Sequence, residues 1–311
     1  MSGSSSATRK TRGSRARSTR ESGYKPARRT VPAALLDPKA IEAATGLTPE
    51  VTGDVVKVSH PRADVKVEID GWATPPFMGL TAWAAFTTAG AGVEAMVLGD
   101  MVLFEDEVSD AMSAALRSGL HVTALHNHFF FDRPRVFFMH IAGEGRVDML
   151  GAGVRSIVDV MKAVRARSPE PASRFEGPAI PETSSIDAGQ VEAIFGVKAA
   201  TKDGMAKVTV GRIAQAENGR RIGNAMGINT WAAFAGTDDN AVVDGDFAVT
   251  EDELQPVLRA LRGGGIHVVA IHNHMVGETP RILFLHYWGR GEVTSLATIV
   301  KRAIDLTKTG D

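Results

Sequence analysis

The sequence predicts an α+β protein made of two tandem homologous domains, each a mainly antiparallel sheet with helices packed on it. The first observation is a repeated stretch: GLHVTALHNHFFFDRPRVFFMHIAGEG at 119–145 returns as GIHVVAIHNHMVGETPRILFLHYWGRG at 265–291. The second is that strand-like runs follow one another within each copy, with the helical segments set apart from them. The third is RSPEPASRFEGPAIPETSS at 167–185, whose Pro and Ser content is typical of a linker.

These observations divide the chain into four parts. Residues 1–33 form a basic tail that we expect to be disordered, because residues 1–30 hold nine Lys or Arg, one Glu and almost no large apolar side chain. The first repeat domain is expected at 34–165, the linker at 166–187 and the second repeat domain at 188–311. At 311 residues and 44% hydrophobic content, the chain has room for two domains and a sizeable core.

The elements are expected in the same order in each copy. Short strands such as VVKVS, VKVEI and AKVTV come first, and the segments LTAWAAF, INTWAAF and VEAMVLGDMVLF continue the β character. A helix is expected at 106–117 and at 252–262, and in the second copy it starts with the capping-box sequence TEDE. Two further strands carry the histidines, and a final helix near 151–165 and 294–306 closes each copy.

A histidine-rich β-hairpin is the main functional signal of the first copy. Side chains alternate along a strand, so His126 and His128 share one face. If residue 126 lies opposite residue 138, His140 on the returning strand is a diagonal neighbour of His126, within roughly 5–8 Å. Three imidazoles then converge on one point, and the second copy has the same spacing.

A carboxylate in the turn of each hairpin completes the predicted sites. Three histidines and one carboxylate are a standard nitrogen–oxygen ligand set for a divalent transition metal. We expect zinc as the cofactor, with iron, manganese, nickel or copper as alternatives. The predicted ligands are His272, His274, Glu278 and His286 in the second copy, and His126, His128, Asp132 and His140 in the first.

The predicted function is a metal-dependent enzyme that performs hydrolytic or oxidative chemistry on a small molecule. Glu278 is the expected catalytic group, since a carboxylate in a turn can move a proton to or from metal-bound water. Substrate binding is assigned to Lys207, Arg212 and Arg281. The alternative is a non-catalytic metal- or ligand-binding protein, and a third interpretation treats the histidines as hydrogen-bonded core residues.

The two copies differ in the turn of the hairpin. Asp132 in the first copy has a side chain one methylene shorter than Glu278 in the second. Phe129, Phe130 and Phe131 also make the turn of the first copy far more apolar. We therefore expect the second copy to hold the intact site.

Composition excludes several other classes of protein. After residue 30 the chain holds 26 basic and 35 acidic side chains, so the folded body is not expected to bind nucleic acid by general electrostatics. No apolar run approaches the roughly 18 residues of a membrane span. No apolar segment follows the N-terminal arginines, so a secretory signal is not expected, and the absence of cysteine excludes disulfides and thiolate metal sites. A cytoplasmic location is expected, and the oligomeric state is not predicted.

The motifs K-V-[ST], TWAAF, HNH and PRxxFxH, together with the glycines between them, resemble the LppY/LpqO family of bacterial proteins. The resemblance covers residues 36–306 in two copies, and the run from HNH to PRxxFxH is its most specific part. Some members of that family carry lipoprotein-type leaders. The family is a domain of unknown function, so the resemblance implies a domain identity and no reaction.

Overall fold

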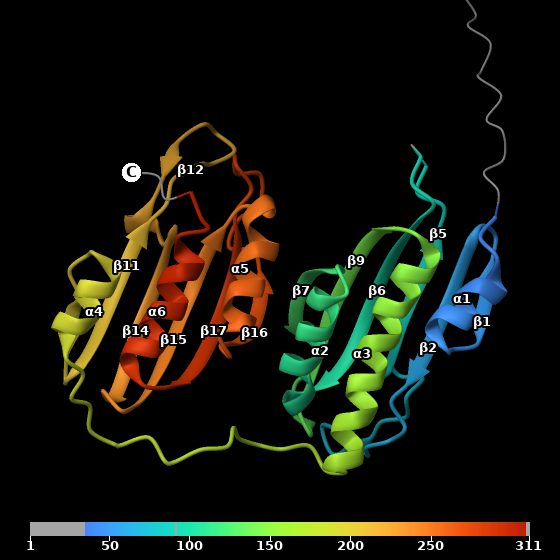
Figure 1. The fold of residues 1–311 in the computed structure, drawn as a ribbon, viewed down its shortest axis with the longest axis horizontal. Coiled ribbons are helices and arrows are strands. Elements are labelled where there is room, and N and C mark those ends of the chain that lie inside the picture. Colours follow the sequence, from blue (N-terminus) through green and yellow to red (C-terminus); the bar gives the residue numbers. More distant parts are fainter. Residues whose placement is uncertain (1–34, 91, 309–311) are drawn as a thin grey trace, which may run out of the picture. The chain divides into compact units, whose positions relative to one another are not determined.

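The computed structural model describes residues 35–90 and 92–308. The described residues belong to one compact unit that contains both repeats (Figure 1). The basic tail predicted at residues 1–33 therefore lies outside the described residues.

The first repeat contains three helices and nine strands among its described residues. In chain order they are α1 (Pro38–Thr45), β1 (Pro49–Thr52), β2 (Val55–Pro61), β3 (Glu68–Ile69), β4 (Trp72–Ala73), β5 (Thr81–Thr87), β6 (Ala95–Phe104), α2 (Glu105–Arg117), β7 (His121–Asn127), β8 (Asp132–Arg133), β9 (Val136–Gly145) and α3 (Val147–Arg167).

The second repeat follows the same plan. Its elements are α4 (Ala188–Phe195), β10 (Ala200–Lys202), β11 (Met205–Gly211), β12 (Ala214–Gln215), β13 (Arg221–Ile222), the 3-10 helix η1 (Asn224–Met226), β14 (Asn229–Thr237), β15 (Asn240–Val249), α5 (Glu251–Gly263), β16 (His267–His272), β17 (Leu283–Gly291) and α6 (Val293–Ile304).

One twelve-stranded antiparallel sheet runs through both repeats in the order β1-β2-β5-β6-β9-β7-β16-β17-β15-β14-β11-β10. Each repeat contributes six strands in equivalent order, counted from its outer edge to the junction between β7 and β16. Two small sheets, β4-β3-β8 and β12-β13, are separate from it. The prediction of a repeated fold with helices and a large antiparallel sheet is confirmed, but the repeats share one main sheet.

The junction between the repeats joins equivalent strands. Leu125 of β7 pairs with Ile271 of β16, and these two residues occupy the same position in their copies. Gln255 of α5 supports the junction, because its side chain accepts a hydrogen bond from the Val122 amide (3.1 Å) and donates one to the Val122 carbonyl (2.8 Å). The side chain thereby satisfies backbone groups at a position where β7 is irregular.

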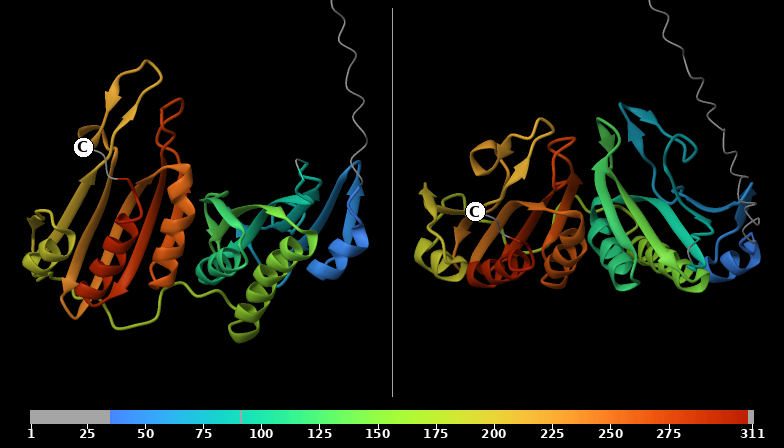
Figure 2. Two further views of the ribbon diagram at one scale, coloured as in Figure 1. Left: turned by 45° about the horizontal axis from the view of Figure 1, so that its top comes forward. Right: turned by 90° about the horizontal axis from the view of Figure 1, so that it is seen from above.

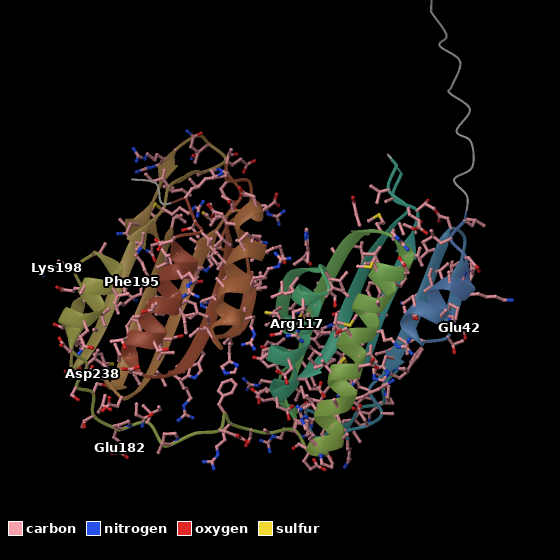
Figure 3. The ribbon with its side chains drawn as sticks, in the orientation of Figure 1. Glu42, Arg117, Glu182, Phe195, Lys198 and Asp238 are labelled. Carbon is pink, nitrogen blue, oxygen red and sulfur yellow. The ribbon has the colours of Figure 1, made fainter. Side chains whose placement is uncertain are left out.

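The helices of each repeat cover one face of its sheet and leave the opposite face open (Figure 2). The alternation along β5 explains how: Ala82, Ala84 and Phe86 are buried in the core, while Trp83 is half-buried on the other face. On the helix side, Phe195 of α4, labelled in Figure 3, packs against Phe234 of β14 with a ring-centroid distance of 6.1 Å. The polar residues of each strand therefore gather on the open face.

Helices α2 and α5 follow the long strands β6 and β15. Each has a glutamate in its first turn that accepts a hydrogen bond from the backbone amide of the residue before the helix. In α5, the Glu253 carboxylate accepts a hydrogen bond from the Thr250 amide at 2.9 Å, which confirms the capping box. In α2, Glu107 accepts the equivalent bond from the Phe104 amide at 3.0 Å. The end of each strand is thereby tied to its helix.

The helical segments between and after the strands differ somewhat from the expected bounds. The first closing helix starts at Val147 and extends to Arg167, beyond the predicted end at residue 165. The domain and linker boundaries stay predictions. No helix within residues 35–90 and 92–308 is long and apolar enough to cross a membrane.

Candidate functional site

A row of side chains crosses the open sheet face of the first repeat. Cross-strand partners point to the same face, so the register places Ser59 of β2, Trp83 of β5, Asp100 of β6, His140 of β9 and Ala124 of β7 side by side. The row ends at β7, the strand that pairs with β16 of the second repeat and that also carries His126. The sequence predicted the histidines and did not predict the aspartate beside them.

The second repeat has the same row at equivalent positions. Thr209 of β11, Trp231 of β14, Asp246 of β15, His286 of β17 and Ala270 of β16 are successive cross-strand partners. A signal for the two aspartates was present in the sequence, since Asp100 and Asp246 occupy matched positions in segments rich in apolar residues, VEAMVLGDMVLF and AVVDGDFAV. An acid repeated at a matched position of a core strand is a candidate functional residue.

In the first repeat only two of the three predicted histidines come together. The Nε2 atoms of His126 and His140 are 3.0 Å apart, and Nδ1 of His126 lies 3.0 Å from the Asn127 carbonyl oxygen. His128 instead packs between aromatic rings, with centroids 4.8 Å from Phe129 and 4.5 Å from Phe138. The first repeat therefore presents an imidazole pair.

In the second repeat the three histidines gather around Asp246. Nε2 of His272 lies 3.2 Å from Nε2 of His274, and the rings of His272 and His286 are 4.8 Å apart. The Asp246 carboxylate is 3.9 Å from Nε2 of His274 and 3.8 Å from Nδ1 of His286. The ring of His274 also stacks on Phe284 at 3.5 Å.

Burial favours the uncharged forms of these groups. It raises the pKa of Asp246 to about 6, although His286 acts in the opposite direction, and it raises the pKa of Asp100 above its ordinary value. Burial, and then the charge of His286, lowers the pKa of His272 and of His274. In the second-repeat cluster, burial therefore favours a protonated Asp246 beside neutral His272 and His274.

The carboxylates predicted as metal ligands stabilise the turns that carry them. Asp132 Oδ2 accepts a hydrogen bond from the Val136 amide at 2.6 Å, and Glu278 Oε1 accepts the equivalent bond from the Ile282 amide at 2.9 Å. Glu278 is buried. Within the described ranges, neither carboxylate forms a hydrogen bond or ion pair with a histidine.

The three basic residues assigned to substrate binding do not form one site. Arg212 is buried, and its guanidinium donates to both carboxylate oxygens of Glu253 (2.6 and 3.0 Å) and to the Ala248 carbonyl (3.1 Å). Lys207 lies on the open face, with Nζ 3.8 Å from the Trp231 ring centroid. Arg281 is exposed, with its guanidinium 3.5 Å from the Glu251 carboxylate. A substrate role for these residues stays a prediction.

The function predicted from the histidines is corrected. Among residues 35–90 and 92–308, no group of three or more His, Cys, Asp or Glu side chains is arranged to hold a metal ion. Neither the enzyme with its small-molecule substrate nor the metal- or ligand-binding alternative is retained. The ligand, catalytic and cofactor assignments of single residues stay predictions.

The turn between β7 and β9 holds a bulky residue in an uncommon backbone conformation. Phe131 has φ = 59°, in the left-handed region that a bulky side chain rarely adopts, and it is 77% exposed. Its counterpart in the second repeat is Gly277, with φ = 81°. Glycine is the residue expected at such a position. The first repeat thus accepts backbone strain at a residue whose side chain gains little internal packing.

Other exposed apolar side chains surround this turn. Strand β3 pairs with β4 on one side and β8 on the other, and the Asp70 amide donates to the Phe131 carbonyl at 3.4 Å. A Cβ atom at Gly79 would lie 3.4 Å from the Phe129 ring, so the turn before β5 also lies here. We call this set the aromatic surface, made up of Trp72, Phe77, Met78, Phe130 and Phe131.

Comparison with solved structures gives low similarity throughout. A double-ringed trimeric shell protein from the RMM microcompartment has 11% sequence identity and a TM-score of 0.19, over 68% of this chain and 82% of the other. The trimeric bacterial microcompartment shell protein PduB also has 11% identity and a TM-score of 0.19, over 82% of this chain and 87% of the other. At these values, no role carries over to this chain.

No curated protein matches the chain. One family model does match, and it does so twice, once in each repeat. The LppY/LpqO assignment made from the motifs is corrected by this match. The chain belongs to the family described as Domain of Unknown Function (DUF1259), with copies at residues 39–160 and 189–306.

Proposed function

We propose that the protein is a self-associating structural protein, and that the aromatic surface of the first repeat binds a second copy of the chain. The observation that carries this proposal is Phe131, an exposed aromatic residue in a left-handed conformation. Keeping a non-glycine residue there costs roughly 1–2 kcal/mol. A side chain that gains little burial in the single chain does not offset this cost, whereas burial against a partner does.

The size of the aromatic surface supports the same proposal. Phe77 is 93% exposed and Phe130 is 86% exposed, and both belong to a surface of five large apolar side chains. Single exposed apolar residues are ordinary, but a contiguous set rimmed by polar residues is typical of a protein–protein contact. Aromatic side chains also contribute the most to such contacts.

The charges around the aromatic surface favour a partner with its own mixed charges, such as a second copy. Asp70 and Arg133 are exposed on either side of Phe131, and within the described part of the chain neither has an ion pair. A nucleic acid or an acidic membrane would leave Asp70 facing like charge. A copy of the same chain supplies both signs. The cytoplasmic location stays a prediction.

A matched pair of variants tests the proposal. Phe130→Ala removes an exposed ring from the aromatic surface, and Val276→Ala removes an exposed apolar side chain at the equivalent position of the second repeat. Light scattering after gel filtration, over a series of concentrations, gives the mass of the full chain and both variants. We expect the wild type and Val276→Ala to associate, and Phe130→Ala to associate at least about ten-fold more weakly.

Two results would overturn the proposal. One is a wild-type chain that stays monomeric at every concentration measured. The other is an equal effect of Phe130→Ala and Val276→Ala on association, which would mean that the first-repeat turn has no special role. Circular dichroism of each variant excludes unfolding as the cause of a lost association.

A further inference from the structure

A cavity of about 740 Å³ lies where the segment between the repeats passes β16 and β17. Its apolar lining includes Phe137 from β9, Phe175 and Ile180 from the connecting segment, and Val269 and Trp288 from the second repeat. Pockets of a few hundred to a thousand Å³ with mainly apolar walls and a few polar groups are typical binding sites. None of the five residues of the aromatic surface lines this cavity.

The connecting segment forms a fixed wall of the cavity. The ring of Phe175 stacks on His267 with a centroid distance of 3.9 Å. The Arg290 guanidinium donates hydrogen bonds to the carbonyl oxygens of Phe175 and Pro178. At the other end, the Ala172 amide donates to Asp106 Oδ2 at 3.0 Å. Because these contacts hold the wall in place, the cavity exists before a partner binds, which lowers the cost of binding.

We infer that this cavity receives Phe130 and Phe131 of a second copy, an inference that rests on the proposed self-association. The two rings are large, exposed and adjacent, with centroids 6.5 Å apart, and the cavity offers aromatic walls of matching chemistry. Aromatic side chains that fill an apolar pocket are the usual anchors of an interface. The cavity volume of about 740 Å³ is also large enough for both rings.

Charges beside the two surfaces are complementary. Arg133 lies two residues after the second ring in the sequence and is exposed. Asp244 lines the cavity and is exposed, and the described residues give it no ion pair. Docking of the turn into the cavity brings Arg133, which lies opposite Glu68, to Asp244, which interacts with His286 and Lys207, and the added pair of opposite charges favours one orientation of the contact. The second-repeat turn lacks this chemistry, because Val276 and Gly277 replace the two rings.

The contact joins two different surfaces of the chain. Each copy therefore offers one turn and one cavity, and a copy whose turn is bound still has a free cavity. Such a head-to-tail contact forms rings when the rotation closes and open chains when it does not. A contact of turn against turn would instead stop at the dimer.

Complementation between two variants tests this arrangement. Phe131→Gly has a defective turn and an intact cavity, and Val269→Glu places a charge on the cavity wall and leaves the turn intact. Leu98→Glu, at an exposed apolar residue outside the cavity, is the matched control. We expect each of the first two to associate at least about ten-fold more weakly than the wild type alone, and their mixture to form a one-to-one complex.

The outcomes separate this inference from the proposed function. Undiminished association of Phe131→Gly overturns the proposed function. If Phe131→Gly loses association while Val269→Glu keeps it, the turn binds elsewhere and the cavity inference is wrong. No complex in the mixture, with both variants folded by circular dichroism, also overturns the cavity inference. Leu98→Glu is expected to associate like the wild type, and an equal loss there would show that any added charge disrupts the contact.

Charge reversal provides a second readout. Arg133→Asp places like charge opposite Asp244 and is expected to weaken association by at least about ten-fold. Asp244→Arg in the same chain restores the pair, and the double variant is expected to recover most of the association. A double variant that is no better than Arg133→Asp alone would contradict the pairing.

Discussion

The turns of the two hairpins have related backbones and opposite surfaces. Both place a residue in the left-handed region, Phe131 in the first repeat and Gly277 in the second. A Cβ atom at Gly277 would lie 3.3 Å from Cβ of Glu217, so the second-repeat turn is closely packed against its neighbour. The first-repeat turn exposes its rings instead. The two turns therefore differ at the left-handed residue, which lies beside Glu217 in the second repeat and exposes an aromatic ring in the first.

The histidine clusters differ in a related way. In the first repeat His128 packs against Phe129 and Phe138, leaving the pair His126 and His140. In the second repeat His274 turns toward Asp246. His128 and His274 both contact the equivalent phenylalanine, Phe138 or Phe284. The clusters differ in which imidazole nitrogens approach each other, those of His126 and His140 in the first repeat and those of His272 and His274 in the second.

The largest difference in stability is expected between two equivalent buried ion pairs. Glu107 binds Arg62 at 2.7 Å and Arg165 at 2.9 Å, whereas Glu253 binds a single arginine, Arg212. Arg62 also pairs with Asp64 at 2.9 Å, and Arg165 also pairs with Asp106, whereas among the described residues Arg212 pairs only with Glu253. Removing the single partner of a buried charge leaves that charge uncompensated, so Glu253→Gln is expected to cost about 3–5 kcal/mol. Glu107→Gln is expected to cost less. Urea unfolding measures both free energies, and a larger loss for Glu107→Gln would contradict this comparison.

A smaller effect is expected from pH. Burial, and then the charge of Arg262, lowers the pKa of His267 to about 4 from its ordinary 6.5. The folded state therefore disfavours the charged form, and stability present above pH 6.5 is lost as the pH falls toward 4. The loss is on the order of 1–2 kcal/mol after allowance for solvent screening.

The counterpart of His267 in the first repeat, His121, is exposed and serves as the control. Unfolding is measured at several pH values between 7 and 4 for the wild type, His267→Gln and His121→Gln. We expect His267→Gln to flatten the pH dependence and His121→Gln to leave it unchanged. The same slope in all three proteins would show that His267 does not titrate in this way.

The smallest effects concern the two turns themselves. Phe131→Gly relieves a strained backbone at the cost of a more flexible unfolded chain, so it is expected to raise the free energy of unfolding by about 0.5–1 kcal/mol. Gly277→Ala introduces strain and a close contact with Glu217, so it is expected to lower it by about 1 kcal/mol or more. Thermal unfolding measures both. If the two variants changed the free energy of unfolding in the same direction, the expectation that Phe131 is strained and Gly277 is relaxed would be wrong.

Periodicity and repetition predicted the fold well, because they depend on local chemistry. The matched copies predicted the repeated architecture, and the spacing of Thr250 and Glu253 predicted the start of α5. The sharing of one sheet could not be predicted, since it depends on a single strand pair, Leu125 with Ile271, whose residues look like any other core residues. Pairing between strands far apart in sequence has no local signal.

The candidate site was harder to predict for a different reason. The alternation of side chains correctly grouped His272 and His286, but it says nothing about which rotamer each side chain adopts. His128 shares a strand face with His126 and still packs on Phe138. The turn carboxylate Glu278 binds the Ile282 amide, a local contact that a count of ligand types does not reveal.

Our central claim is that the chain retains the strained backbone at Phe131 because the Phe131 side chain contacts another copy. Sedimentation equilibrium of the wild type and Phe131→Gly, together with their thermal unfolding at low concentration, tests it most directly. We predict opposite changes: Phe131→Gly unfolds at a higher temperature and associates at least about ten-fold more weakly. Association equal to that of the wild type, at the same or higher thermal stability, would contradict the claim.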